Sequence, residues 1–99
     1  MAAYIIARVE VTDWDKYGEY MKVTPDVIAQ YGGRFVARGG DMVTLEGPEE
    51  TRRLILLAFP TMERAKAWYH SGEYQNAKKI RAGAATASFV VIDGVEASQ

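Results

Sequence analysis

The most apolar stretch of the chain runs from Leu54 to Pro60 and has no polar side. Successive side chains of a β-strand point to opposite faces, so the even-numbered and odd-numbered residues of this stretch would lie on opposite sides of a sheet. Both sets are apolar. The pattern therefore predicts a central strand over residues 54–60, with a layer of structure covering each of its two faces.

Three other stretches alternate between two kinds of side chain, as strands with one buried face do. They are residues 4–11, 34–38 and 84–93. The second of them is interrupted by Gly39-Gly40-Asp41, and strand character resumes over residues 42–46. We therefore expect a bulge or tight bend at these glycines, followed by a continuation of the second strand.

Large side chains have helical spacing over residues 14–31, after a capping signal at Thr12-Asp13. Pro25 lies inside this segment. Proline has no backbone N–H to donate, and it disfavours the helical conformation at the residue before it. The sequence therefore predicts a helix of about three turns, a break or kink, and a shorter helix that starts near Thr24.

Two shorter helices are predicted in the second half of the chain. Thr61 can cap the first, whose apolar face includes Ala65 and Trp68. Ser71 can cap the second, which Gly83 ends. The order of elements predicts one α+β domain over residues 1–99, of the ferredoxin-like βαββαβ type, with a four-stranded antiparallel sheet and helices on one face. Right-handed crossovers place the first and third strands in the middle of that sheet.

Helices on one side of the sheet leave the other side bare. That side still carries large apolar groups, which make a larger exposed patch than a soluble monomer tolerates. Packing two sheets face to face about a twofold axis would cover both patches. We therefore expect a homodimer that forms through the sheet face.

Composition narrows the range of functions. The 99 residues carry a formal net charge of -1 and include one histidine and no cysteine. This charge provides no basic field for nucleic acid or an anionic membrane, and thiol chemistry is excluded. We expect no metal site and no cofactor, because a single histidine makes a zinc site improbable and no glycine-rich phosphate loop follows a strand. With no recognisable signal peptide or membrane-spanning run, the expected location is the cytoplasm.

Several motifs occur together along the chain: Tyr31-Gly-Gly-Arg-Phe-Val-Ala-Arg-Gly-Gly40, Phe59-Pro60, Trp68-Tyr-His-Ser-Gly-Glu-Tyr-Gln75 and Arg81-Ala-Gly-Ala-Ala85. In these motifs the chain resembles the family called domain of unknown function 1330, over residues 4–95. The resemblance implies a dimeric α+β barrel. Similar barrels include cofactor-free oxygenases, antibiotic-type monooxygenases and small-molecule isomerases, whereas the family itself has no assigned reaction. Trp14 departs from the pattern, which would place proline or another small residue at the start of the helix.

Arg38 and Gly39 are candidate substrate-binding residues. Glycine lets a ligand or another chain approach the backbone closely, and arginine offers a planar set of donors to a carboxylate or enolate. The alternative is a structural bulge whose arginine pairs with Asp41, with Glu46 or with a partner subunit.

His70 and Tyr74 are candidate catalytic residues that would move a proton. Histidine exchanges protons readily near neutral pH, but a half-exposed histidine is also favoured by the dipole at a helix C-terminus. Trp68 and Arg81 lie on inward faces and are candidates for lining a substrate pocket between helices and sheet. The alternative is that the aromatic residues Trp68 and Tyr74 are simply part of the core.

Two functions follow from these candidates. The first is a small enzyme without a cofactor, an oxygenase or isomerase acting on a small organic acid or aromatic compound. The second is a non-catalytic dimeric module that binds a metabolite or only assembles. The enzyme predicts that Arg38 and His70 converge on one cavity, whereas the module predicts Arg38 in an ion pair and His70 in water.

Overall fold

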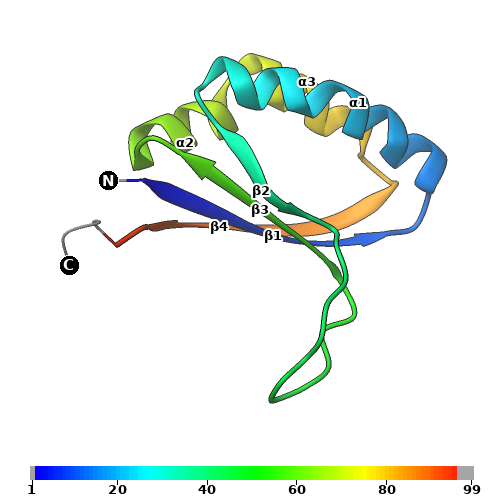
Figure 1. Cartoon of the computed structure of the whole chain (residues 1–99). Coiled ribbons are helices and arrows are strands. Elements are labelled where there is room, and N and C mark those ends of the chain that lie inside the picture. The colour runs from blue at the N-terminus through cyan, green and yellow to red at the C-terminus, as the bar shows by residue number, and fades with distance from the viewer. Residues whose placement is uncertain (1, 96–99) are drawn as a thin grey trace.

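The computed structural model describes residues 2–95, which form one sheet with a layer of helices on a single face (Figure 1). The elements are β1 (Ala3–Val11), α1 (Trp14–Gln30), β2 (Arg34–Arg38), β3 (Arg53–Phe59), α2 (Met62–His70), α3 (Gly72–Ile80) and β4 (Ala85–Asp93). The strands pair antiparallel in the order β2-β3-β1-β4. The predicted ferredoxin-like α+β arrangement is therefore confirmed, with the first and third strands in the middle.

The apolar run forms the central strand β3, as predicted. Its odd-numbered residues Leu57 and Phe59 are buried beneath the helices, where the Phe59 ring lies 5.4 Å from that of Trp68. Its even-numbered residues Leu54 and Leu56 are half-buried on the opposite side, which we call the open face. The two-sided apolar pattern thus corresponds to one face in the core and one face that no helix covers.

The helices begin where the capping residues predict. Asp13, Thr61 and Ser71 each accept a hydrogen bond from the backbone N–H three residues later. Such a bond satisfies one of the donors that a helix N-terminus leaves without a partner. None of the helices within residues 2–95 is long and apolar enough to cross a membrane.

The first helix corrects the prediction of a break at Pro25. α1 is continuous with Pro25 inside it. Proline cannot donate to the carbonyl of Met21, four residues earlier, and its ring pushes that carbonyl outward. The Met21 oxygen accepts a hydrogen bond from Arg38 Nη2 at 3.0 Å instead. Because Val27 and Ile28 are buried beyond the proline, packing on the sheet also holds the second half of the helix in line.

The chain after the second strand corrects one further prediction and confirms another. Residues 39–52, which we call the arm, are a loop and not a resumed strand, and they extend from the sheet on the side away from the helices (Figure 1). The bend expected at the glycines is present at Gly39, and a bulge also lies earlier, between Phe35 and Ala37. The Gly39 N–H donates to the Leu54 carbonyl at 2.9 Å, which is the last bond of this strand pair. At Gly39, which has a φ of 66°, the chain turns out of the sheet. Residues 42–46 have no neighbouring strand to pair with, so their alternating pattern forms no strand.

Candidate functional site

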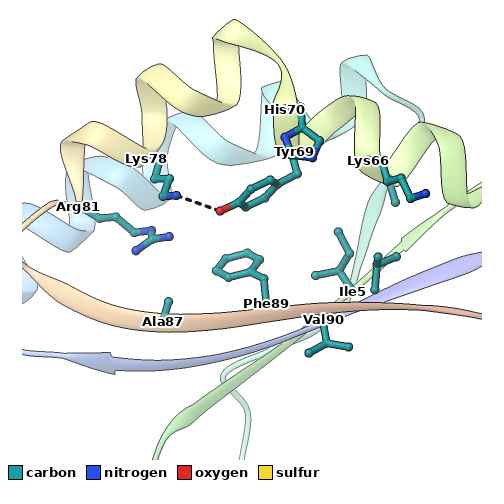
Figure 2. Close-up of a pocket in the computed structure, with 11 residues that line it drawn as sticks. Ile5, Lys66, Tyr69, His70, Lys78, Arg81, Ala87, Phe89 and Val90 are labelled. Atoms are coloured by element: carbon teal, nitrogen blue, oxygen red, sulfur yellow. Dashed lines mark hydrogen bonds between the residues drawn. The ribbon is translucent and has the colours of Figure 1, made fainter.

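A cavity of about 350 Å³ opens beside β4, an edge strand of the sheet, beneath α2 and α3 (Figure 2). We call it the outer cavity. The sheet supplies Ile5, Ala87 and Phe89, and the helical layer supplies Lys66, Tyr69, His70, Lys78 and Arg81. No carboxylate from residues 2–95 is among the lining residues. The cavity is therefore basic and partly aromatic, and its volume falls in the range of small-molecule sites.

Arg81, directly after α3, is the most deeply placed cation of the outer cavity. It is 8% exposed, and its guanidinium carbon lies 5.5 Å from the centre of the Tyr20 ring and 5.6 Å from that of Phe89. Its Nε has no hydrogen-bond partner, and none of the ion pairs within residues 2–95 includes it. Burial alone would lower the pKa of Arg81, but Tyr74 and Tyr20 raise it overall, so the positive charge is retained. A buried cation with no anion beside it is costly, which makes this position suited to an anionic ligand.

A smaller void of about 30 Å³ lies deeper, between α1 and the sheet. This inner void shares Arg81 and Phe89 with the outer cavity, and Arg38, Arg53 and Trp68 also line it. Like the Nε of Arg81, the Nε1 of Trp68 and the Nε of Arg53 are buried there without a partner. A space of this size holds about one or two water molecules. The inner end of the site is therefore rich in unpaired donors.

Buried tyrosines pack around these arginines. The hydroxyls of Tyr20 and Tyr74 are hydrogen-bonded at 2.8 Å, and the Tyr74 ring lies 4.3 Å from that of Trp68. Burial and the adjacent Tyr74 hydroxyl raise the pKa of Tyr20 far above its ordinary value. Burial also raises the pKa of Tyr17, with Arg53 opposing the rise. Tyr17 and Tyr20 therefore stay protonated at neutral pH, and they serve as packing groups.

His70 lies at the exposed rim of the outer cavity, at the last position of α2 (Figure 2). Its ring is perpendicular to that of Tyr69, with the ring centres 5.4 Å apart. The Tyr69 hydroxyl accepts a hydrogen bond from Lys78 Nζ at 2.9 Å. No side-chain hydrogen bond among the described residues fixes the imidazole. His70 can therefore reach a ligand in the cavity, but no second residue orients it.

The structure brings four of the six predicted site residues to these two spaces. His70 and Arg81 line the outer cavity, while Arg38, Trp68 and Arg81 line the inner void. Tyr74 is fully buried behind Trp68 and lines neither space. Arg38 and His70 do not converge on one cavity. Within residues 2–95 Arg38 forms no ion pair, and its guanidinium donates to the Met21 carbonyl of α1. The arrangement thus matches neither of the two patterns expected from the sequence.

Gly39 was predicted to let a ligand or another chain approach the backbone closely. The group that approaches it is a side chain of the same chain, Arg53. The guanidinium of Arg53 lies so close to Gly39 that an added Cβ would collide with it. The neighbourhood of Gly39 is a third hollow, near Trp14 and Met42, and not the outer cavity.

Three cationic residues of the site, Lys66, Lys78 and Arg53, were not predicted from the sequence. The helical pattern assigns Lys78 to the water-facing side of its helix, yet its amine lies over Tyr69 in the outer cavity. Arg53 directly precedes the apolar run and would be taken for its polar flank. Its odd residue number could have indicated this position. Alternate residues of a strand share a face, so Arg53 lies on the helix-facing side with Ile55 and Leu57.

The family model described as Domain of unknown function (DUF1330) matches residues 2–95. The chain belongs to this family. The resemblance seen in the sequence motifs is therefore confirmed. No curated protein matches this DUF1330 member at a significant level.

Several solved structures share the fold of this DUF1330 protein. One is a protein of unknown function from Rhodopseudomonas palustris, with 17% identity, a TM-score of 0.76, and 96% of this chain and 83% of that chain covered. Another is a dimeric ferredoxin-like protein of unknown function from Jannaschia sp. CCS1, with 15% identity, a TM-score of 0.69, and coverage of 95% and 100%. A third is SnoaB, a cofactor-independent oxygenase from Streptomyces nogalater, with 9% identity, a TM-score of 0.68, and coverage of 96% and 94%. At these identities the likeness concerns the fold alone.

Proposed function

We propose that this DUF1330 protein is a homodimeric enzyme that binds a small organic acid or aromatic compound in the outer cavity and transforms it without a cofactor. The observation that carries the proposal is Arg81, a buried cation that pairs with no carboxylate of residues 2–95, at the inner wall of an aromatic-lined cavity. A ligand carboxylate, phenolate or enolate would pair with this guanidinium and offset the cost of burying it.

In the proposed reaction, His70 takes a proton from the ligand at the rim, and Arg81 stabilises the anion that forms. That anion can pass electrons to dioxygen. One CH₂ group of the ligand then becomes a carbonyl, and its two hydrogens leave with the second oxygen atom as water. An isomerase would instead return the proton to another carbon atom. SnoaB, which shares the fold, is described as a cofactor-independent oxygenase, and this supports the first route.

The other predicted site residues take supporting positions in this proposal. Trp68 closes the inner end of the site, and Tyr74 holds Trp68 in place through ring contact. Arg38 and Gly39 lie outside the outer cavity, and we assign them structural roles in α1 and at the start of the arm.

The homodimer rests on the open face. Val90 and Ile92 of β4 are 55% and 54% exposed there, on the same face as the half-buried Leu54 and Leu56 of β3, with β1 between the two strands. Two open faces packed about a twofold axis would bury these side chains together. The similar protein from Jannaschia is described as dimeric, which supports this assembly. Light scattering should give about twice the chain mass of 11.0 kDa at micromolar concentration, and a mass near 11.0 kDa would oppose the dimer.

A second candidate function, a non-catalytic binding module, is favoured by one observation. The imidazole of His70 is exposed and has no hydrogen bond that orients it within the described residues. General bases are usually held in place by such a bond. A module of this kind would use Arg81 to bind the same ligands and leave them unchanged.

The test is a thermal-shift screen of carboxylates and phenols against the wild type, Arg81→Gln and Arg64→Gln. Arg64 is exposed on α2 and lines neither cavity, so it is the matched control. We expect at least one compound to raise the melting temperature of the wild type and of Arg64→Gln but not of Arg81→Gln. If no compound binds, or if Arg81→Gln responds like the wild type, the proposed role of Arg81 is wrong.

A compound that binds then separates the two functions. Oxygen uptake, or exchange of a ligand hydrogen for solvent deuterium, would identify an enzyme, and either signal should fall in His70→Gln. Binding with neither signal would support the non-catalytic module.

A further inference from the structure

The arm carries large apolar side chains that its own chain leaves uncovered. Leu45 is 94% exposed, Val43 is 81% exposed and Met42 is 41% exposed. Single exposed apolar residues are common, but three within four positions form a patch that marks an interaction surface.

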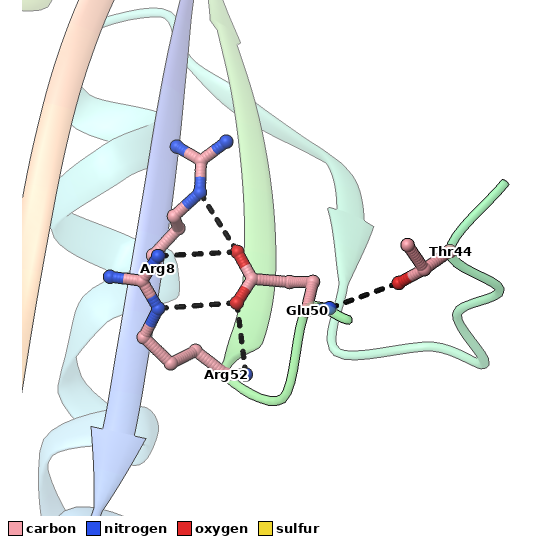
Figure 3. Close-up of polar contacts among 4 residues, drawn as sticks. All are labelled: Arg8, Thr44, Glu50 and Arg52. Carbon is pink, nitrogen blue, oxygen red and sulfur yellow. Dashed lines mark hydrogen bonds and ion pairs between the residues drawn. The ribbon is translucent and has the colours of Figure 1, made fainter. Parts of the chain in front are cut away.

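A set of polar contacts centred on Glu50 holds the arm in place (Figure 3). The Glu50 carboxylate accepts from Arg8 Nε at 3.0 Å and from Arg52 Nε at 3.2 Å. Arg8 belongs to β1 and pairs with Leu54 on the open face. The Glu50 N–H also donates to Thr44 Oγ1 at 3.0 Å, which joins the two limbs of the arm. These contacts give the arm a defined shape and leave the Leu45 side chain uncovered.

The arm and the open face lie on the same side of the sheet, opposite the helices (Figure 1). No helix or strand of the described chain lies on that side to cover either of them. Two copies packed through their open faces would bring each arm alongside the other copy. We infer that the arm is an intersubunit clamp whose exposed side chains Val43 and Leu45 pack against a second copy of this chain. The inference rests on the proposed homodimer and adds a contact beyond the packing of the two sheets.

A second copy fits these surfaces better than an unrelated partner. One association about a twofold axis would bury both arms and both open faces, since each copy offers the same two surfaces. Charge also favours it. The arm residues Asp41, Glu46 and Glu49 belong to no ion pair within residues 2–95, and neither does Arg34 on the open face of β2. Opposite charges on facing surfaces favour the correct partner.

The first test measures the dimer dissociation constant of Leu45→Asp by analytical ultracentrifugation. Placing a charge at a buried interface position should raise this constant at least about tenfold. Val23→Asp is the matched control, because Val23 is exposed on α1, in the helical layer, and should leave the constant unchanged. Leu45 is nearly fully exposed within one chain, so its substitution leaves the fold of the subunit intact.

The second test places a photoreactive benzoylphenylalanine at position 45. Irradiation should give a covalent species of twice the chain mass, joined to a peptide of the other copy. Adducts within one chain only, or an unchanged dissociation constant in Leu45→Asp, would overturn the clamp while leaving the dimer and the ligand site standing. A wild-type protein that is monomeric would overturn the clamp and the dimer together.

Discussion

Single side chains and backbone positions account for much of the local structure near the site. Arg53 and Gly39 are the clearest pair. The guanidinium of Arg53 occupies the space that a side chain at Gly39 would need, and Gly39 has a φ of 66°, where residues with a Cβ are strained. From the sequence, Gly39 indicates a close approach to the backbone but does not say which group makes it.

Gly39→Ala should lower the free energy of unfolding by about 1–3 kcal/mol, because it combines a strained φ with displacement of Arg53. Gly40→Ala is the matched control, since an added Cβ there meets nothing within 4 Å. It should change stability little. Urea unfolding of the two variants measures the difference, and equal losses would show that Gly39 has no special role.

At the scale of elements, α1 shows why a local rule failed. The proline rule concerns one lost backbone bond, and the sequence gives no sign that a side chain from β2 replaces it. Arg38 does so by donating to the Met21 carbonyl, while its guanidinium also lies 4.3 Å from the Phe35 ring.

A double-mutant cycle tests this replacement. Arg38→Ala should cost about 0.5–1.5 kcal/mol of unfolding free energy in the wild type, the usual range for one hydrogen bond. In the Pro25→Ala background the restored N–H bonds the Met21 carbonyl, so the same substitution should cost less. The cost of Arg38→Ala that remains in the Pro25→Ala background measures the packing of Arg38 on Phe35. An equal cost in both backgrounds would contradict the proposed replacement.

Elements were predictable where their signals are local. The two-residue alternation located three strands, the two-sided apolar run located β3, and the caps Asp13, Thr61 and Ser71 located the starts of the three helices. The arm was not predictable, because residues 42–46 have the pattern of a strand but no strand to pair with. The outer cavity was predictable only in part. It depends on how the edge of β4 lies beneath two helices, which brings Lys78 and Arg81 together with His70.

At the scale of the whole molecule, the sheet divides two proposed activities. Ligand binding belongs to the helical side, where the outer cavity and the inner void lie. Assembly belongs to the open face and the arm, which Glu50 links to β1. The sequence indicated the bare sheet face through the two-sided apolar strand β3.

The contribution of Glu50 should depend on pH. Hydrogen bonds from Arg52, and then from Arg8, lower the pKa of Glu50 below its ordinary value of 4.5. Because the folded state binds this proton less readily than the unfolded state, the stabilisation is present above the ordinary pKa and is lost as the pH falls through the lower, folded-state value. The stability difference between wild type and Glu50→Gln should therefore be constant above about pH 5 and shrink in more acidic solution.

Acid titration of the unfolding free energy measures this difference. Glu49→Gln is the control, because Glu49 is exposed and forms no ion pair within residues 2–95. The difference in unfolding free energy between wild type and Glu50→Gln could instead stay the same from neutral to acidic pH. That result would rule out the lowered pKa of Glu50 as the source of the difference.

The central claim is that Arg81 pairs with the anionic group of a ligand in the outer cavity. The most direct measurement follows the Nε–Hε signal of Arg81 by ¹H–¹⁵N NMR, assigned through its loss in Arg81→Lys, during titration with a compound found by thermal shift. We predict that this signal shifts and saturates with the ligand while that of Arg64 stays in place. An Arg81 signal that does not move as the ligand saturates the protein would contradict the claim.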